Sequence, residues 1–143
     1  MDRDLTYSII GYVMKVHSKL GPGLLESVYR KALMIELDNE CLSAEEEVPL
    51  DIIYDGIDLG LGFRMDILVE NQIILELKSV SALEKVHFKQ LQTYLKLSNK
   101  PLGYLINFNT DKMAGFFERA RPTASISSMK MIQCALVLAF SKR

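Results

Sequence analysis

The sequence predicts a mixed α/β or α+β domain in which helices pack against a mixed β-sheet. Three observations predict this class. Apolar residues recur at helical spacing before residue 40 and again after residue 81, strand-like runs fill the segment between, and Asp55-Gly56 marks a tight hairpin. The chain has 143 residues, 49% of them hydrophobic, which is enough for one core and excludes a disordered chain.

Two helices are predicted at the start of the chain. The first begins at Asp4 or Thr6, carries apolar side chains every three or four positions to Leu20, and ends at Gly21-Pro22-Gly23. Residues 24–39 repeat this spacing with strong helix formers between the apolar positions. The two helices therefore follow each other through one short turn.

Strands and one further helix are predicted next. Asp55-Gly56 suits a two-residue turn because both central residues of such a turn take positive φ. A helix over 82–97 and a short apolar strand over 102–108 close the predicted core. The strand-like runs are residues 48–54, 57–61, 63–69 and 73–80.

The segment from residue 109 to residue 143 follows a different pattern. Residues 113–120 predict a helix and residues 122–128 a loop. Residues 129–140 are apolar and fit either a helix or a strand.

Composition excludes several classes of protein. The longest apolar run, Cys134 to Phe140, is far shorter than the roughly 20 residues of a membrane-spanning helix. The first four residues are acidic rather than basic, so no secretory signal is indicated and we expect a cytoplasmic protein. Cys41 and Cys134 stand alone, which predicts reduced packing residues rather than a zinc site or a disulfide framework.

The net charge of −1 hides a segregated distribution of charge. Residues 36–76 contain twelve acidic residues and one basic residue, whereas residues 77–100 contain five lysines and one acid. Two interpretations are open. The charges form two solvated faces, or a basic strip lies beside an acidic site that holds a polyanion and a metal cation.

Asp66, Glu76 and Lys78 carry the candidate chemistry. Side chains alternate along a strand, so Glu76 and Lys78 share one face. A three-residue loop over 70–72 places Asp66 opposite Glu76, whereas a two-residue loop would place it opposite Leu75 and on the other face. We expect the three-residue loop.

In that register the β-carbons of Asp66 and Glu76 lie about 5 Å apart. Two carboxylates so close repel each other, and hard oxygen ligands of this kind suit Mg²⁺ or Mn²⁺. Lys78 would then orient or deprotonate the attacking water, or balance charge on a phosphate. The alternative is a surface salt-bridge ladder in which Lys78 neutralises Glu76. Because both acids interrupt apolar strands, where buried charge is costly, the metal site is favoured.

Further short motifs accompany these residues. They are Val16-His17, Leu20-Gly21-Pro22-Gly23, Gly23-Leu24-Leu25-Glu26-Ser27-Val28-Tyr29, Gly62-Phe63-Arg64-Met65-Asp66, Leu75-Glu76-Leu77-Lys78, Gln90-Leu91-Gln92-Thr93-Tyr94 and Leu105-Ile106-Asn107-Phe108. In this order they resemble the GxxExxY family, small proteins assigned to the PD-(D/E)XK nuclease superfamily. The resemblance covers roughly residues 5–108.

The resemblance implies a restriction-endonuclease-like core with Asp66, Glu76 and Lys78 as the nuclease triad. Asp66, Glu76 and the backbone carbonyl of Leu77 would hold the metal ion. The RecB and phage lambda exonuclease-like branch of the superfamily also has an upstream helical glutamate. Glu26 would be this residue, acting as an additional metal ligand or a water-orienting carboxylate.

The same branch has a Gln-xxx-Tyr helix, so Gln90 and Tyr94 would line the site and position the substrate. Their spacing puts them on one helix face, although an ordinary surface pair with a partly buried ring has the same spacing. His17 precedes the turn that delivers Glu26 and is a further candidate for substrate binding, with a packing role as its alternative. His87 is a weaker candidate of the same kind.

We therefore expect one nuclease-like domain over residues 1–143, with its core at about 5–108 and residues 109–143 as a divergent C-terminal extension. The predicted function is a Mg²⁺- or Mn²⁺-dependent nuclease that hydrolyses phosphodiester bonds, in DNA rather than RNA. The modest net charge predicts weak, salt-dependent binding by a monomer, which a homo-oligomer would strengthen. Two alternatives are a catalytically silent nucleic-acid-binding module and a protein-interaction or regulatory domain whose Glu45-Glu46-Glu47 faces a basic partner.

Overall fold

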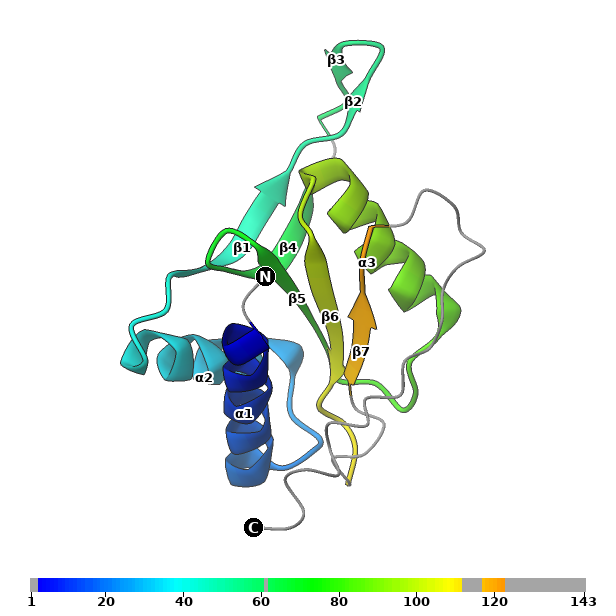
Figure 1. Cartoon of the computed structure of the whole chain (residues 1–143). Helices are drawn as coiled ribbons and strands as arrows, with labels where there is room; N and C mark the ends of the chain where they lie inside the picture. The colour runs from blue at the N-terminus through cyan, green and yellow to red at the C-terminus, as the bar shows by residue number, and fades with distance from the viewer. Residues whose placement is uncertain (1–2, 61, 112–116, 123–143) are drawn as a thin grey trace.

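The computed structural model describes residues 3–60, 62–111 and 117–122 (Figure 1). No helix in these ranges has the length and apolar character needed to cross a bilayer. The elements in chain order are α1 (Arg3–Leu20), α2 (Glu26–Asn39), β1 (Ala44–Leu50), β2 (Ile53–Tyr54), β3 (Ile57–Asp58), β4 (Phe63–Val69), β5 (Ile73–Lys78), α3 (Lys85–Ser98), β6 (Leu102–Asn107) and β7 (Phe117–Ala120).

Five of the strands form one mixed sheet in the order β1-β4-β5-β6-β7. Neighbours are antiparallel except for β5 and β6, which run parallel because α3 carries the chain back between them. A mixed sheet flanked by helices is the predicted fold class, which the structure confirms.

The sheet separates two layers of helix, with α1 and α2 on one face and α3 on the other (Figure 1). Side-chain alternation along β4 and β5 distributes their residues between two cores. Ile67 and Leu75 pack in the core beneath α1 and α2. Leu68 and Ile74 pack in the core beneath α3. Each of these strands is therefore covered on both faces.

Helix α3 lies close to β6 because Gly103 has no side chain. A Cβ added at Gly103 would lie 2.8 Å from a methyl carbon of Leu91, which is closer than real Cβ contacts. Glycine thus sets how near the helix can come to the sheet. The helix carries Gln90 and Tyr94, so this close approach also sets their height above the strands.

The predicted strand over residues 48–54 is wrong in its limits. The structure divides this segment, because β1 starts at Ala44 and leaves the sheet after Leu50, where its pairing with β4 ends. The next residues form the separate β2–β3 hairpin. Its turn is the predicted one, with φ of 48° at Asp55 and 73° at Gly56.

The predicted helix over residues 113–120 is also wrong for its described part. Residues 117–120 form β7, which pairs antiparallel with β6 and covers an edge that would otherwise be open. The predictions for residues 123–128 and 129–140 lie outside the described residues. Cys41 is exposed, which contradicts the packing role predicted for it, and Cys134 lies outside the described residues.

Candidate active site

The register of β4 and β5 determines which side chains lie opposite each other in the candidate site. Val69 pairs with Ile73 across a three-residue connection, in which Glu70 and Asn71 both adopt positive φ. Continuing the register places Asp66 opposite Glu76, so the predicted loop and pairing are confirmed.

Side chains replace backbone pairing at this point of the two strands. The backbone N–H of Asp66 donates to Glu76 Oε1 at 3.1 Å. The backbone N–H of Leu77 donates to Asp66 Oδ2 at 2.8 Å. Each carboxylate therefore accepts a hydrogen bond from the opposite strand, and these bonds hold the two side chains side by side.

Burial makes this pair of acids electrostatically costly. Glu76 is 3% exposed and Asp66 is half-buried. Burial, reinforced by the charge of Asp66, raises the pKa of Glu76 from 4.5 to about 8. Burial also raises the pKa of Asp66, against the hydrogen bond from Leu77 and with a smaller contribution from the charge of Glu26. A divalent cation between the two carboxylates would remove this repulsion.

Lys78 and two residues of α3 cover the same face of the sheet. The Lys78 ammonium donates to Gln90 Oε1 at 3.3 Å, and Gln90 Nε2 donates to the Tyr94 hydroxyl at 2.7 Å. Burial raises the pKa of Tyr94 against the hydrogen bond from Gln90, and smaller contributions from the charges of Glu76 and Asp66 place the phenol near the acids. The predicted cluster of Lys78, Gln90 and Tyr94 is thus assembled in the structure, with Gln90 linking the other two.

Glu26 is the first residue of α2, and the turn before it is held from two sides. Gly21 has a φ of 68°, in the left-handed region that favours glycine. The Tyr29 hydroxyl donates to the Gly21 carbonyl at 2.5 Å and accepts from the Leu24 N–H at 3.2 Å. The Ser79 hydroxyl donates to the Leu24 carbonyl at 2.6 Å, which ties the start of α2 to the end of β5.

This tie brings Glu26 within electrostatic range of Asp66 but not into a compact ligand set. Within residues 3–60, 62–111 and 117–122, no three His, Cys, Asp or Glu side chains converge closely enough to hold a metal ion together. Asp66 and Glu76 thus form a pair, to which the Leu77 carbonyl would add a third oxygen. Carboxylate and carbonyl oxygens fit a hard divalent cation, which retains water for its remaining positions. A direct ligand role for Glu26 stays a prediction.

Arg30 supplies positive charge on the α2 side of this site. Its Nε lies 3.2 Å from Glu46 Oε2 and its Nη2 lies 3.7 Å from Glu47 Oε1. The β1–β4 register places Glu47 opposite Asp66, and Glu47 has a left-handed φ of 51°. A non-glycine residue in this conformation marks local backbone strain beside the acids.

The two histidines have structural partners. His17 is buried, and its Nε2 lies 2.7 Å from the Thr110 carbonyl oxygen, within hydrogen-bond distance. Its ring lies 6.5 Å from that of Phe108, which in turn stacks on Tyr29 at 4.3 Å. His87 Nδ1 accepts from the Glu84 N–H at 2.9 Å at the start of α3. Substrate binding by His17 stays a prediction.

Asn107, for which no functional role was predicted, is 2% exposed. Its Oδ1 accepts from the Val80 and Asn109 N–H groups at 3.1 Å, and its Nδ2 donates to the Val80 carbonyl at 2.9 Å. The Phe108 N–H donates to the Lys78 carbonyl at 2.9 Å. These bonds fix the chain directly after Lys78. The sequence feature that could have indicated this role is a single side-chain amide near the end of the apolar run 102–108.

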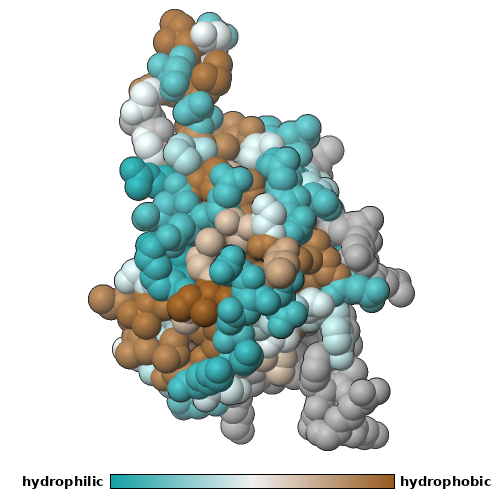
Figure 2. Space-filling model, turned by 90° about the vertical axis from the view of Figure 1, so that its left-hand side faces the viewer, coloured by the Kyte–Doolittle hydropathy of each residue, from teal (hydrophilic) through white to brown (hydrophobic). Residues whose placement is uncertain are grey.

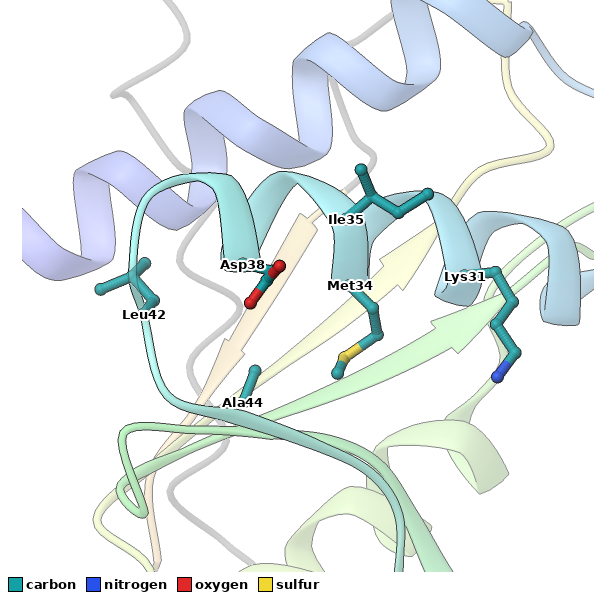
Figure 3. Close-up of a pocket in the computed structure, with 6 residues that line it drawn as sticks. All are labelled: Lys31, Met34, Ile35, Asp38, Leu42 and Ala44. Carbon is teal, nitrogen blue, oxygen red and sulfur yellow. The ribbon is translucent and has the colours of Figure 1, made fainter.

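A separate hollow of about 350 Å³ lies between α2 and the start of β1. Its lining is Lys31, Met34, Ile35, Asp38, Leu42 and Ala44 (Figure 3). Figure 3 shows Met34 and Lys31 extending from α2 toward the strands. None of the predicted site residues lines this hollow, so it is distinct from the acidic pair.

Comparisons with known proteins agree with this fold. The chain resembles the crystal structure of SSO0001 with a TM-score of 0.53 and 22% identity, over 82% of this chain and 67% of that one. This likeness concerns the fold. No curated protein matches the sequence. Residues 3–120 match the PD-(D/E)XK nuclease superfamily, a span that includes the acidic pair and its lysine. The chain therefore belongs to the PD-(D/E)XK nuclease superfamily.

Proposed function

We propose that this protein is a divalent-metal-dependent nuclease that uses Mg²⁺ or Mn²⁺ to hydrolyse phosphodiester bonds in DNA. One observation carries the proposal. Asp66 and Glu76 are held side by side in the sheet by reciprocal hydrogen bonds, with Lys78 next along the same face. Buried like charges of this kind are costly in a merely structural role.

Asp66, Glu76 and the Leu77 carbonyl would hold the metal ion, as superfamily members generally depend on divalent metals. When bound, a metal ion of this kind lowers the pKa of a coordinated water and stabilises negative charge on the phosphate. Glu26 would bind the same ion or orient the water from the start of α2. These assignments follow the donor chemistry of the residues present.

Lys78 would orient the attacking water or balance the charge that develops on the phosphate. Gln90 accepts a hydrogen bond from the Lys78 ammonium and donates one to Tyr94, so it would set the direction of the lysine. Tyr94 and Gln90 would also contact the substrate backbone from α3. His17 would bind substrate, as its position before the turn that leads to Glu26 predicts.

Membership of the GxxExxY family and of the RecB and phage lambda exonuclease-like branch is part of the proposal. It rests on the ordered motifs from Val16 to Phe108. The preference for DNA over RNA is part of the same proposal, and the cytoplasmic location stays a prediction from the sequence. A single domain over residues 1–143 likewise stays a proposal.

The test is a cleavage assay on plasmid, linear double-stranded and single-stranded DNA in Mn²⁺, with and without a chelator. RNA is the parallel substrate. Glu76→Gln keeps the side-chain shape and removes the charge, and Glu45→Gln is a matched control on the exposed edge of β1. Wild type and Glu45→Gln should cleave DNA in Mn²⁺ and should stop when the chelator is added. Glu76→Gln should not cleave DNA in either condition.

Three results would contradict the proposal in different ways. Cleavage that persists in chelator would exclude the metal. Retention of DNA without cleavage would indicate a silent binding module. Neither cleavage nor retention would leave the protein-interaction domain as the better interpretation.

A further inference from the structure

The β2–β3 hairpin, residues 51–60, stands apart from the rest of the described chain. Figure 1 and Figure 2 show it projecting from the body. None of its residues belongs to either core, and all are exposed except the half-buried Ile52. Its strands have two residues each. A hairpin this short is marginally stable in water when nothing packs on it.

The hairpin exposes large apolar side chains together. Ile53, Tyr54 and Ile57 are each more than half exposed, and Leu59 is nearly so. Four large apolar side chains are thus exposed on one ten-residue projection. Exposed apolar groups gathered in one place generally mark an interaction site. Figure 2 shows hydrophobic and hydrophilic residues mixed over the projecting hairpin.

The charge of the hairpin indicates the chemistry of its partner. Residues 51–60 contain Asp51, Asp55 and Asp58 and no lysine or arginine. Phosphates would be repelled by three carboxylates, so nucleic acid is disfavoured as the partner of this surface. A protein surface that combines apolar side chains with lysines would be complementary to it.

The outer face of α3 has that composition. Lys85, Lys89 and Lys96 are exposed and follow one stripe of the helix, beside the exposed side chains of Val86 and Leu97. Residues that pack on the sheet, such as Leu91, occupy the opposite side of the helix. In the part of the chain that the structure describes, none of the three lysines forms an ion pair. Among the described residues, nothing neutralises the charge of this stripe.

We propose that the hairpin of one chain docks on the outer face of α3 of a second copy of this chain. The hairpin projects away from its own body, so its own α3 is not the partner (Figure 1). A two-fold arrangement makes the contact twice, with each chain giving a hairpin and receiving one. Ile53, Tyr54 and Ile57 would cover Val86 and Leu97, and the three aspartates would face the lysines. The inference is independent of the proposed nuclease activity.

The test is the mass of the full chain measured by sedimentation and light scattering over a wide concentration range. The wild type should move from 16.2 kDa toward twice that mass as concentration rises. Raising salt from about 0.1 M to about 1 M shortens the Debye length from about 10 Å to about 3 Å and should weaken association.

Two double variants remove the two halves of the contact. Ile53→Ser with Ile57→Ser changes the hairpin, and Lys85→Glu with Lys89→Glu changes the helix face. Each should weaken association by about tenfold or more, because each removes residues from the centre of both contacts. Ile35→Ser, an exposed apolar residue of α2, is the control and should associate like the wild type.

An equimolar mixture of the two variants gives the sharpest result. A mixed dimer keeps one intact hairpin on one intact helix face, so the mixture should associate more strongly than either variant alone. The proposal is overturned by a wild type that stays at 16.2 kDa, or by either variant associating like the wild type. An unchanged mass combined with weaker nucleic-acid binding by the hairpin variant would instead make the hairpin a nucleic-acid contact.

Discussion

The two faces of β4 and β5 differ in what they hold. Toward α1 and α2, these strands present Ile67, Leu75 and Leu77 to a continuous apolar core. Toward α3, the residues next in sequence include Asp66 and Glu76. The same two strands thus supply stability on one face and a strained acidic pair on the other. Without a metal ion the acids oppose folding, so substitutions of the acids should change stability and activity in opposite directions.

Glu76→Gln should produce the largest change on the acidic face. Metal-dependent cleavage should fall by more than about 100-fold, because a carboxylate that would bind the metal is lost. The metal-free protein should gain stability, on the order of 1–3 kcal/mol, because glutamine needs neither a buried charge nor the uptake of a proton on folding. Activity assays and urea unfolding in chelator measure the two effects. A variant that is both less active and less stable would contradict the comparison.

The pH dependence of metal-free stability should follow from the same residue. Folding raises the pKa of Glu76 from 4.5 to about 8, so the folded state binds the proton more tightly than the unfolded state. Its contribution is fully present below pH 4.5, and the free energy of unfolding should fall as the pH rises from there through about 8. Urea unfolding of wild type and Glu76→Gln across this range isolates the contribution. If the free energies of unfolding of the two proteins changed with pH in parallel, the contribution of Glu76 would be refuted.

Leu75→Ala should produce the converse result on the apolar face. Leu75 is fully buried, and its truncation should lower the free energy of unfolding by about 2–5 kcal/mol. The stabilisation gained on adding Mn²⁺ should match that of the wild type, because the acids point the other way. Thermal melts with and without Mn²⁺ measure both quantities. Loss of the Mn²⁺ shift in this variant would show that the two faces are not separable.

Ser79→Ala should give the smallest change. It removes the hydrogen bond to the Leu24 carbonyl and should cost about 1 kcal/mol of stability. If the bond positions Glu26, the affinity for Mn²⁺ should also fall, by about tenfold. Ser79→Thr keeps the hydroxyl and should restore the affinity. An unchanged affinity of Ser79→Ala for Mn²⁺ would show that the hydrogen bond between Ser79 and Leu24 contributes only to stability.

The elements that local pattern determines were predictable from the sequence. The limits of β4 and the turn after it were found because alternation and the loop at residues 70–72 act over a few residues. The limits of β1 and β7 were not found, because β1 ends where its pairing with β4 ends and β7 exists through its pairing with β6. Pairing partners far along the chain leave no local signal.

The acidic pair was predictable because it depends on the same local alternation and loop length as its strands. The hydrogen bonds that hold the surrounding chain were not predictable. Asp66 and Glu76 lie ten residues apart across one hairpin. Ser79 bonds to Leu24 over 55 residues, and Asn107 bonds to Val80 over 27. A serine after a strand and an asparagine at the end of one are common in any sequence. Only the three-dimensional arrangement gives them a role.

Calorimetric titration of Mn²⁺ into the metal-free wild type and into Glu76→Gln measures whether the acidic pair binds a metal ion. If Asp66 and Glu76 together hold a divalent cation, the wild type should bind one ion per chain at neutral pH and release protons on binding. Glu76→Gln should show no saturable heat, and the Glu45→Gln control should match the wild type. Equal binding by wild type and Glu76→Gln would exclude a metal site that depends on Glu76.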